Sequence, residues 1–132
     1  MLVLSRFEGE FIDVPQLNVS VVVVRVNGSS ARIGVECPAG HRVLRRELVG
    51  KPQAEEFNPR GGRLVLTRRK SESIIVPSLG FEVMLVDTRG ANKARLGVTA
   101  PDDMKIFRRE LLEKMQSEGV KNEFYRPAFA DS

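Results

Sequence analysis

The feature that most constrains the fold of this chain is an internal repeat, because the second half copies the first. Residues 2–6 (LVLSR) return as residues 64–68 (LVLTR), and residues 45–48 (RREL) return as residues 108–111. Between these segments the same residues recur in the same order, with roughly twenty identities and one inserted residue. Self-similarity of this kind indicates two copies of one structural unit.

The repeat divides the chain of 132 residues into four parts. We expect a first repeat at residues 1–49, a linker at 50–63, a second repeat at 64–119 and a flexible tail at 120–132. A single repeat of about 60 residues buries little apolar surface, so the two copies are expected to share one core. The linker prediction rests on residues that interrupt regular structure, namely Pro52, Pro59, Gly61 and Gly62.

Each copy has the pattern of short β-strands. In the first copy, residues 19–26 form a β-branched run, Asn27-Gly28 is the dipeptide that a type I′ hairpin turn prefers, and residues 31–35 resume the apolar pattern. The loop at residues 87–93 of the second copy carries the inserted residue, so its turn should differ. The remaining expected strands are residues 41–44, 81–86, 94–98 and 104–107.

Only the second copy continues into a helix. From Arg108 to Glu118 apolar residues recur at helical spacing, and Gly119 is a typical C-terminal stop. In the first copy Gly50 and Pro52 interrupt the same segment. The predicted fold class is therefore mainly β with a C-terminal α-helix.

Composition narrows the classes of function. No apolar run approaches the roughly 20 residues of a membrane span, and the first residues do not read as a secretion signal, so we expect a cytoplasmic protein. One cysteine, Cys37, and one histidine, His41, allow neither an internal disulfide nor a usual zinc site. No catalytic motif indicates an enzyme, and no cofactor is expected. The net charge of +4 permits an anionic partner such as nucleic acid without requiring one.

These motifs resemble the carbon storage regulator family, CsrA/RsmA. The resemblance covers residues 1–48 and 64–119, and it is close at the opening LVLSR. It is also close at ARIGV (31–35) and ARLGV (94–98), each of which precedes a proline by three residues. The resemblance implies two CsrA-like subunits fused in tandem. They would form an intertwined, strand-exchanged pseudo-dimer, with the first strand of one copy beside the last strand of the other.

The resemblance also implies a function. Proteins of this family bind single-stranded GGA motifs, often in hairpin loops of mRNA leaders, and so block ribosome access or alter mRNA stability. They are not enzymes. The implied partner is single-stranded or hairpin-loop RNA, and a protein antagonist such as FliW is a second candidate partner.

Two composite RNA sites follow from the resemblance, because the family contacts RNA through its first and last strands. The first strand supplies a leucine and adjacent arginines, and the last strand supplies an apolar residue and an arginine. Site one keeps this whole pattern and consists of Leu66, Arg68, Arg69, Val43 and Arg45. Site two consists of Leu4, Arg6, Ile106 and Arg108.

Phe7 stands where the second first-strand arginine of site two is expected, so we predict two unequal sites. A base stacked on Phe7 would preserve site two, and strand alternation also allows Phe7 a core position. Arg46 and Arg109 are further candidates for phosphate contacts. The competing interpretations are that they are solvated or that they pair with Glu47 and Glu110.

A different function and two forms of assembly are also compatible with the sequence. The chain could be a protein-interaction module with weakened RNA binding that engages a FliW-like partner. The fused chain is either a pseudo-dimeric monomer or a strand-exchanged dimer. Arg32 and Arg95 lie between apolar strand residues, so we expect them to face outward or form ion pairs and leave them out of the RNA sites.

Overall fold

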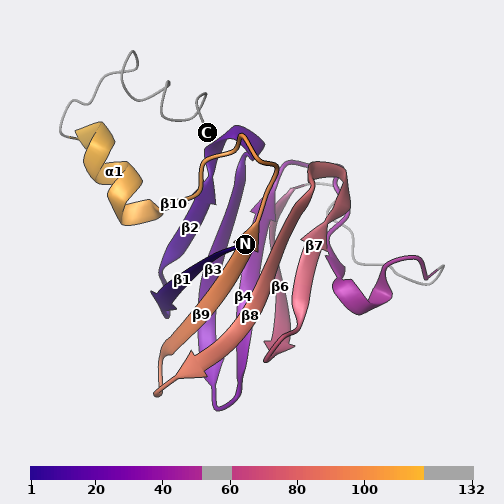
Figure 1. Cartoon of the computed structure of the whole chain (residues 1–132), viewed down its shortest axis with the longest axis vertical. Helices are drawn as coiled ribbons and strands as arrows, with labels where there is room; N and C mark the ends of the chain where they lie inside the picture. Colours follow the sequence, from indigo (N-terminus) through magenta and orange to yellow (C-terminus); the bar gives the residue numbers. More distant parts are fainter. Residues whose placement is uncertain (52–60, 118–132) are drawn as a thin grey trace.

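The computed structural model describes residues 1–51 and 61–117, and Figure 1 shows them as two β-sheets packed face to face. The predicted tail at 120–132 and most of the predicted linker lie outside the described residues. The strand β6 begins at Gly62, within the segment predicted as linker. In the described part of the chain, no helix has the length and apolar character needed to cross a lipid bilayer.

Each sheet has five antiparallel strands and combines both repeats. The first sheet has the order β1-β9-β8-β7-β5 and the second β10-β2-β3-β4-β6, so one repeat supplies the three central strands and the other supplies both edges. The first repeat forms β1 (Leu2–Phe7), β2 (Phe11–Val14), β3 (Val19–Asn27), β4 (Ser30–Cys37) and β5 (Leu44–Arg45). The second forms β6 (Gly62–Arg69), β7 (Ser73–Val76), β8 (Phe81–Arg89), β9 (Lys93–Thr99) and β10 (Phe107–Arg108).

Strand exchange joins the repeats through main-chain hydrogen bonds. β1 pairs with β9 along its whole length, from Leu2 opposite Val98 to Phe7 opposite Lys93. β6 pairs with β4 in the same manner. The expected intertwined pseudo-dimer is therefore confirmed. The first strand of one repeat and the last strand of the other are not paired within a sheet, and each pair instead occupies edges of different sheets.

Both repeats contribute to one hydrophobic core between the sheets. Its fully buried members include Val23 and Ile33 from the first repeat and Leu85 and Leu96 from the second. These side chains alternate along their strands with outward-facing ones, as the two-residue period of a strand requires. A core shared by both repeats buries more apolar surface than a single repeat could bury alone.

The two central hairpins turn differently. Asn27 pairs with Ser30, so the first loop is Gly28-Ser29, and within it only Gly28 has a positive φ, of 63°. A type I′ turn centred on Asn27-Gly28 needs a positive φ at both of those residues, so that prediction is wrong by one position. The second hairpin closes with a three-residue loop after Arg89, which confirms the expected difference.

The helix α1 (Arg109–Ser117) follows β10 and contacts β2. Figure 1 shows it at one corner of the sandwich, beside β10 and β2. This confirms the predicted helix within the described residues. In the first repeat the same segment forms only the 3-10 turn η2 (Arg46–Leu48), after which Gly50 takes a φ of 81°. The other 3-10 turns are η1 (Pro15–Leu17) and η3 (Pro77–Leu79).

Candidate nucleic-acid interface

The predicted site residues gather at two edges of the sandwich. The β6/β5 edge combines β6 of the second repeat with β5 and η2 of the first, and the β1/β10 edge combines β1 of the first repeat with β10 and α1 of the second. Arg68 reaches across one edge to Glu47, and Arg6 reaches across the other to Glu110. The structure thus brings together the two strands of each predicted composite site.

Arg68 is buried at the β6/β5 edge, where only 4% of the residue is exposed. Its Nη1 and Nη2 donate to Glu47 Oε1 and Oε2 at 2.8 and 2.9 Å. Its Nε donates to the Thr67 carbonyl at 2.8 Å and its Nη1 to the Ser73 carbonyl at 3.0 Å. Such a bidentate pair fixes both the distance and the orientation of the two chain segments.

Arg6 repeats this arrangement at the β1/β10 edge and is also 4% exposed. Its Nη1 and Nη2 donate to Glu110 Oε1 and Oε2 at 2.8 and 2.7 Å. Two main-chain carbonyls complete the set, at Ser5 (2.9 Å) and Phe11 (3.1 Å). We call the two bidentate pairs, Arg68 with Glu47 and Arg6 with Glu110, the inter-repeat clamps.

The clamps differ from the sequence-based interpretation in two ways. The resemblance implies RNA contact by Arg6 and Arg68, but in this structure their donors are directed to protein acceptors and their side chains are withdrawn from solvent. The sequence suggests Glu47 and Glu110 only as partners of the neighbouring Arg46 and Arg109. A signal for their role was present, because both glutamates belong to the repeated RREL segment.

The clamps lower the pKa of both glutamates. The hydrogen bond from Arg68 lowers the pKa of Glu47 from its ordinary 4.5 to about 2, with smaller contributions that include the nearby charge of Arg45. The hydrogen bond from Arg6 lowers the pKa of Glu110 to about 2, and the charge of Arg108 contributes there. The arginines of the last strands therefore lie near the clamps.

Acid should weaken the fold between about pH 4.5 and pH 2. A carboxylate with a depressed folded-state pKa contributes stability that is complete above its unfolded pKa and is lost as the pH falls toward the folded value. We expect the free energy of unfolding in urea to decline through this window and the decline to flatten in a Glu47→Gln, Glu110→Gln variant. Arg95 lowers the pKa of Asp87 to about 2, so the variant should still lose some stability as the pH falls. An unchanged slope would contradict the assignment.

The apolar site residues belong mostly to the core. The side chains of Leu4, Leu66 and Val43 are buried in the shared core, and Ile106 packs against it while remaining partly exposed. Leu4 and Leu66 nevertheless lie on the edge strands β1 and β6, and Val43 and Ile106 directly precede the edge strands β5 and β10. Edge strands carry polar main-chain groups without a neighbouring strand in the same sheet.

The two edges differ in the residues that they present to solvent. At the β6/β5 edge Arg69 and Lys70 are exposed. At the β1/β10 edge the matching positions hold Phe7, which is 47% exposed, and Glu8. The Lys93 ammonium lies over the Phe7 ring, 5.6 Å from its centre. Phe7 therefore faces outward, and a core position for it is wrong.

Arg45 and Arg108 occupy equivalent positions on β5 and β10. Arg45 is partly buried and Arg108 is exposed. Each lies on an edge strand, next to the glutamate-bearing segment of a clamp. They are the last-strand cations on which the two predicted sites depend.

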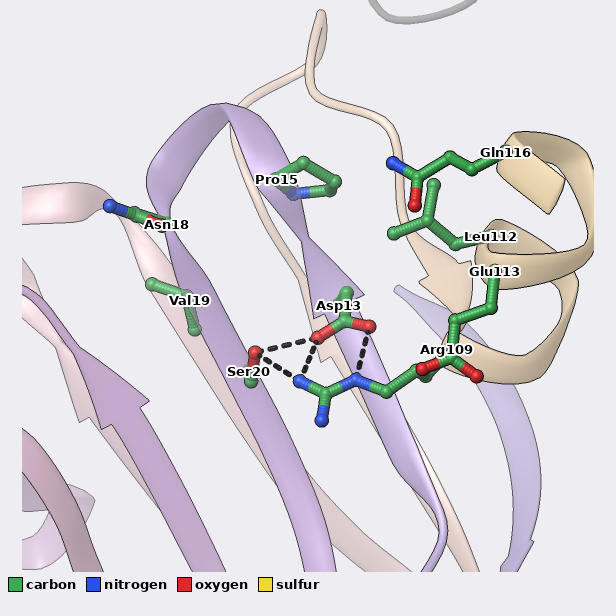
Figure 2. Close-up of a pocket in the computed structure, with 9 residues that line it drawn as sticks. All are labelled: Asp13, Pro15, Asn18, Val19, Ser20, Arg109, Leu112, Glu113 and Gln116. Carbon is green, nitrogen blue, oxygen red and sulfur yellow. Dashed lines mark hydrogen bonds and ion pairs between the residues drawn. The ribbon is translucent and has the colours of Figure 1, made fainter. Parts of the chain in front are cut away.

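Arg109 is held in a local network, which Figure 2 shows beside the hollow between α1 and the second sheet. It donates to the two carboxylate oxygens of Asp13 at 2.9 and 2.8 Å and to Ser20 Oγ at 3.0 Å. Its guanidinium also lies 3.8 Å from the centre of the Phe11 ring. By contrast, 61% of the Arg46 side chain is exposed, and its contact with Glu82 is 3.6 Å long. Of these two candidates, Arg46 is the one presented mainly to solvent.

Within the described ranges, no three His, Cys, Asp or Glu side chains gather as the ligands of a metal ion would. Cys37 is buried there.

Comparisons with known proteins agree with the repeat architecture. The model of the CsrA family, described as a global regulator protein family, matches residues 1–54 and 64–117. A translational regulator CsrA from Brachyspira hyodysenteriae is 41% identical over 58 residues, which are 44% of this chain and 68% of that relative. The CsrA of Halothermothrix orenii is 44% identical over 55 residues, which are 42% of this chain and 65% of that relative. Each alignment therefore spans about one repeat and about two thirds of the relative.

A third relative, the translational regulator CsrA of Campylobacter jejuni, is 37% identical over 57 residues, 43% of this chain and 73% of its own length. No solved structure matches the chain significantly.

Proposed function

The chain belongs to the CsrA family of global regulators, and we propose that it binds RNA and thereby regulates translation or mRNA stability. Membership in a family of regulators supports the expectation of a non-enzymatic protein. The proposed ligand is a single-stranded GGA motif, presented in the loop of a hairpin in an mRNA leader. Unstacked loop bases are the elements that proteins read in RNA sequence-specifically.

The observation that carries this proposal is the meeting of β6 and β5 at one edge, locked by the Arg68–Glu47 clamp. Around the clamp lie the cations Arg69, Lys70 and Arg45. Arginine can contact phosphate or stack its planar guanidinium on a base. In this proposal the clamp fixes the edge, the main chain of the edge strands reads base edges, and these three side chains hold the RNA backbone.

We propose that the β1/β10 edge binds RNA more weakly. It retains the clamp of Arg6 with Glu110 and the last-strand Arg108, but it presents Phe7 and Glu8 where the other edge presents two cations. The Glu8 carboxylate accepts a hydrogen bond from the Val26 amide at 2.8 Å, which keeps a negative charge at that end of the edge. Phosphate contacts are therefore fewer at this site.

A titration with a hairpin carrying GGA in its loop, beside a hairpin with the triplet scrambled, tests the proposal. We expect triplet-dependent binding with one strong site per chain. Equal weak binding of both hairpins would reject the proposed specificity. Two equal sites per chain would reject the proposed asymmetry.

Substitutions at the two last-strand arginines should separate the edges. We expect Arg45→Ala to weaken the strong site about tenfold, because one charged contact to RNA is lost. The matched variant Arg108→Ala should leave the strong site unchanged, since it alters the other edge. Isothermal titration at fixed salt measures both affinities, and equal effects of the two variants would contradict the assignment of the strong site to the β6/β5 edge.

A second candidate function is protein binding by a chain whose RNA affinity is weak, with a FliW-like protein as partner. Exposed apolar side chains at the β1/β10 edge favour it: Met1, Leu2, Val3 and Phe7. Under this alternative, a FliW-like protein would bind the chain in the absence of RNA, and Phe7→Ser would weaken that complex. Triplet-dependent RNA binding without any such complex would eliminate it.

A further inference from the structure

Two arginines lie directly opposite each other on the outer face of the second sheet. Arg25 on β3 pairs in register with Arg32 on β4, and both are exposed. Their neighbours Val26 and Ala31 are buried, which shows that the two arginines point away from the core. Like charges directly opposite on a sheet repel each other, so this pair disfavours the folded chain when nothing binds it.

The second repeat has an aspartate and an arginine, not two arginines, at the equivalent pair of positions. Its register places Asp87 opposite Arg95, and Arg95 donates to the two Asp87 oxygens at 2.9 and 2.6 Å. Arg89 lies 3.5 Å from the same carboxylate, and Lys93 lies over the Phe7 ring. The cations of that face are thus matched by protein groups.

On the equivalent face of the first repeat, the described residues provide no partner for the two arginines. Within residues 1–51 and 61–117, neither Arg25 nor Arg32 forms an ion pair or a side-chain hydrogen bond. Two acidic residues, Glu8 and Glu10, lie near this end of β3. The Glu8 carboxylate accepts from the Val26 amide, and the Glu10 carboxylate accepts from the Phe7 amide. Among these residues, the arginine pair therefore carries charge without a protein counterion.

The pair is continuous with the proposed RNA site. Arg32 pairs in register with the exposed Thr67 on β6, and two residues further along the same face of β6 lies Arg69. Strands in a sheet lie about 4.8 Å apart, so the row from β3 across β4 to β6 spans about 10 Å. At about 3.4 Å of rise per nucleotide in a stacked strand, that span corresponds to roughly three nucleotide steps.

We propose that Arg25 and Arg32 form an extension of the β6/β5 RNA site that binds the phosphates of single-stranded RNA flanking the recognised triplet. This inference rests on the proposed function and deepens it. The extension lies on one side of the molecule alone, since Asp87 occupies the position of Arg25 in the second repeat. Such contacts add affinity without reading sequence.

The test compares two RNAs in a salt series, using the full chain. The first is a GGA hairpin without extensions, and the second is the same hairpin with oligouridine flanks of about ten nucleotides, within the usual size of a single-strand site. We expect an Arg25→Ala, Arg32→Ala variant to bind the flanked RNA about tenfold more weakly and the bare hairpin as the wild type does. The salt slope for the flanked RNA should fall by about 1.4, at 0.7 for each lost phosphate contact.

Two further variants make the result specific. Arg25→Asp recreates the pairing found between Asp87 and Arg95, so it should lose the flank effect with a melting temperature equal to or above that of the wild type. Arg89→Ala removes an exposed cation from the opposite face and should leave both affinities unchanged. Unchanged binding of the flanked RNA by the double variant would overturn the inference, as would equal losses for both RNAs.

Binding of the different RNAs by the wild-type chain distinguishes a failure of this inference from a failure of the proposed function. If the wild type does not distinguish GGA from a scrambled triplet, the proposed specificity fails. The extension still stands in that case if oligouridine alone binds and loses affinity on Arg25→Ala, Arg32→Ala. If oligouridine flanks add no affinity to a hairpin that binds specifically, the extension fails and the proposed function stands.

Discussion

Replacing Glu47 or Glu110 by alanine should destabilise the fold by about 2 kcal/mol each, because either change removes the bidentate carboxylate partner of a buried guanidinium. The carboxylate contacts that remain are longer, at 3.7 Å from Arg68 to Glu72 and 3.6 Å from Arg6 to Glu10. Only 5% of the Arg68 and Arg6 side chains is exposed, whereas the glutamates are 52% and 56% exposed. Water reaches the carboxylate side of each clamp, so the loss should lie below the roughly 3 to 5 kcal/mol typical of fully buried pairs.

A matched control exists on the surface. Arg63 and Glu36 form a pair of 2.8 Å whose side chains are 41% and 34% exposed. We expect Glu36→Ala to cost about 0.5 kcal/mol, the range for exposed ion pairs. Urea unfolding of the three single variants measures these differences. If Glu36→Ala costs as much as the clamp variants, burial of the arginine is not what makes the clamps strong.

The clamps also explain which part of the site could be predicted from sequence. The repeated LVLSR and RREL segments indicate the duplication, and the family resemblance that they carry implies which strands compose each site. They did not indicate that Arg6 and Arg68 would be buried, since an arginine on a strand is usually exposed. Arg6 and Glu110 are separated by 104 positions in the chain, and only the exchange of strands between repeats brings them together.

The fold followed from sequence wherever local pattern and global fold agreed. The β-branched run ending at Val26 and the helix after Arg108 are such places. The hairpin at Gly28 is not, because the strand register, set by burial of Val26 and Ala31, closes the loop at Asn27 and Ser30. The register of β8 and β9 also places Arg95 opposite Asp87. The spacing of these two residues along the chain did not predict that pairing.

Converting the β1/β10 edge to the β6/β5 pattern should strengthen the weak RNA site about a hundredfold. The change is Phe7→Arg with Glu8→Lys, which installs the two residues that the other edge has as Arg69 and Lys70. Each new charged contact to RNA contributes roughly a tenfold gain in affinity. Phe7 is exposed, so its replacement leaves the core intact.

Stoichiometry is the measurement that decides this prediction. We expect titration of the double variant with the GGA hairpin to show two strong sites per chain where the wild type shows one. The reverse change, Arg69→Phe with Lys70→Glu, should weaken the strong site by a similar factor. Glu8→Lys removes the hydrogen bond to the Val26 amide, so Phe7→Arg alone, which keeps that bond, should give about a tenfold gain. If the wild type already binds two hairpins equally, a base stacked on Phe7 replaces the missing arginine, and the predicted gain will not occur.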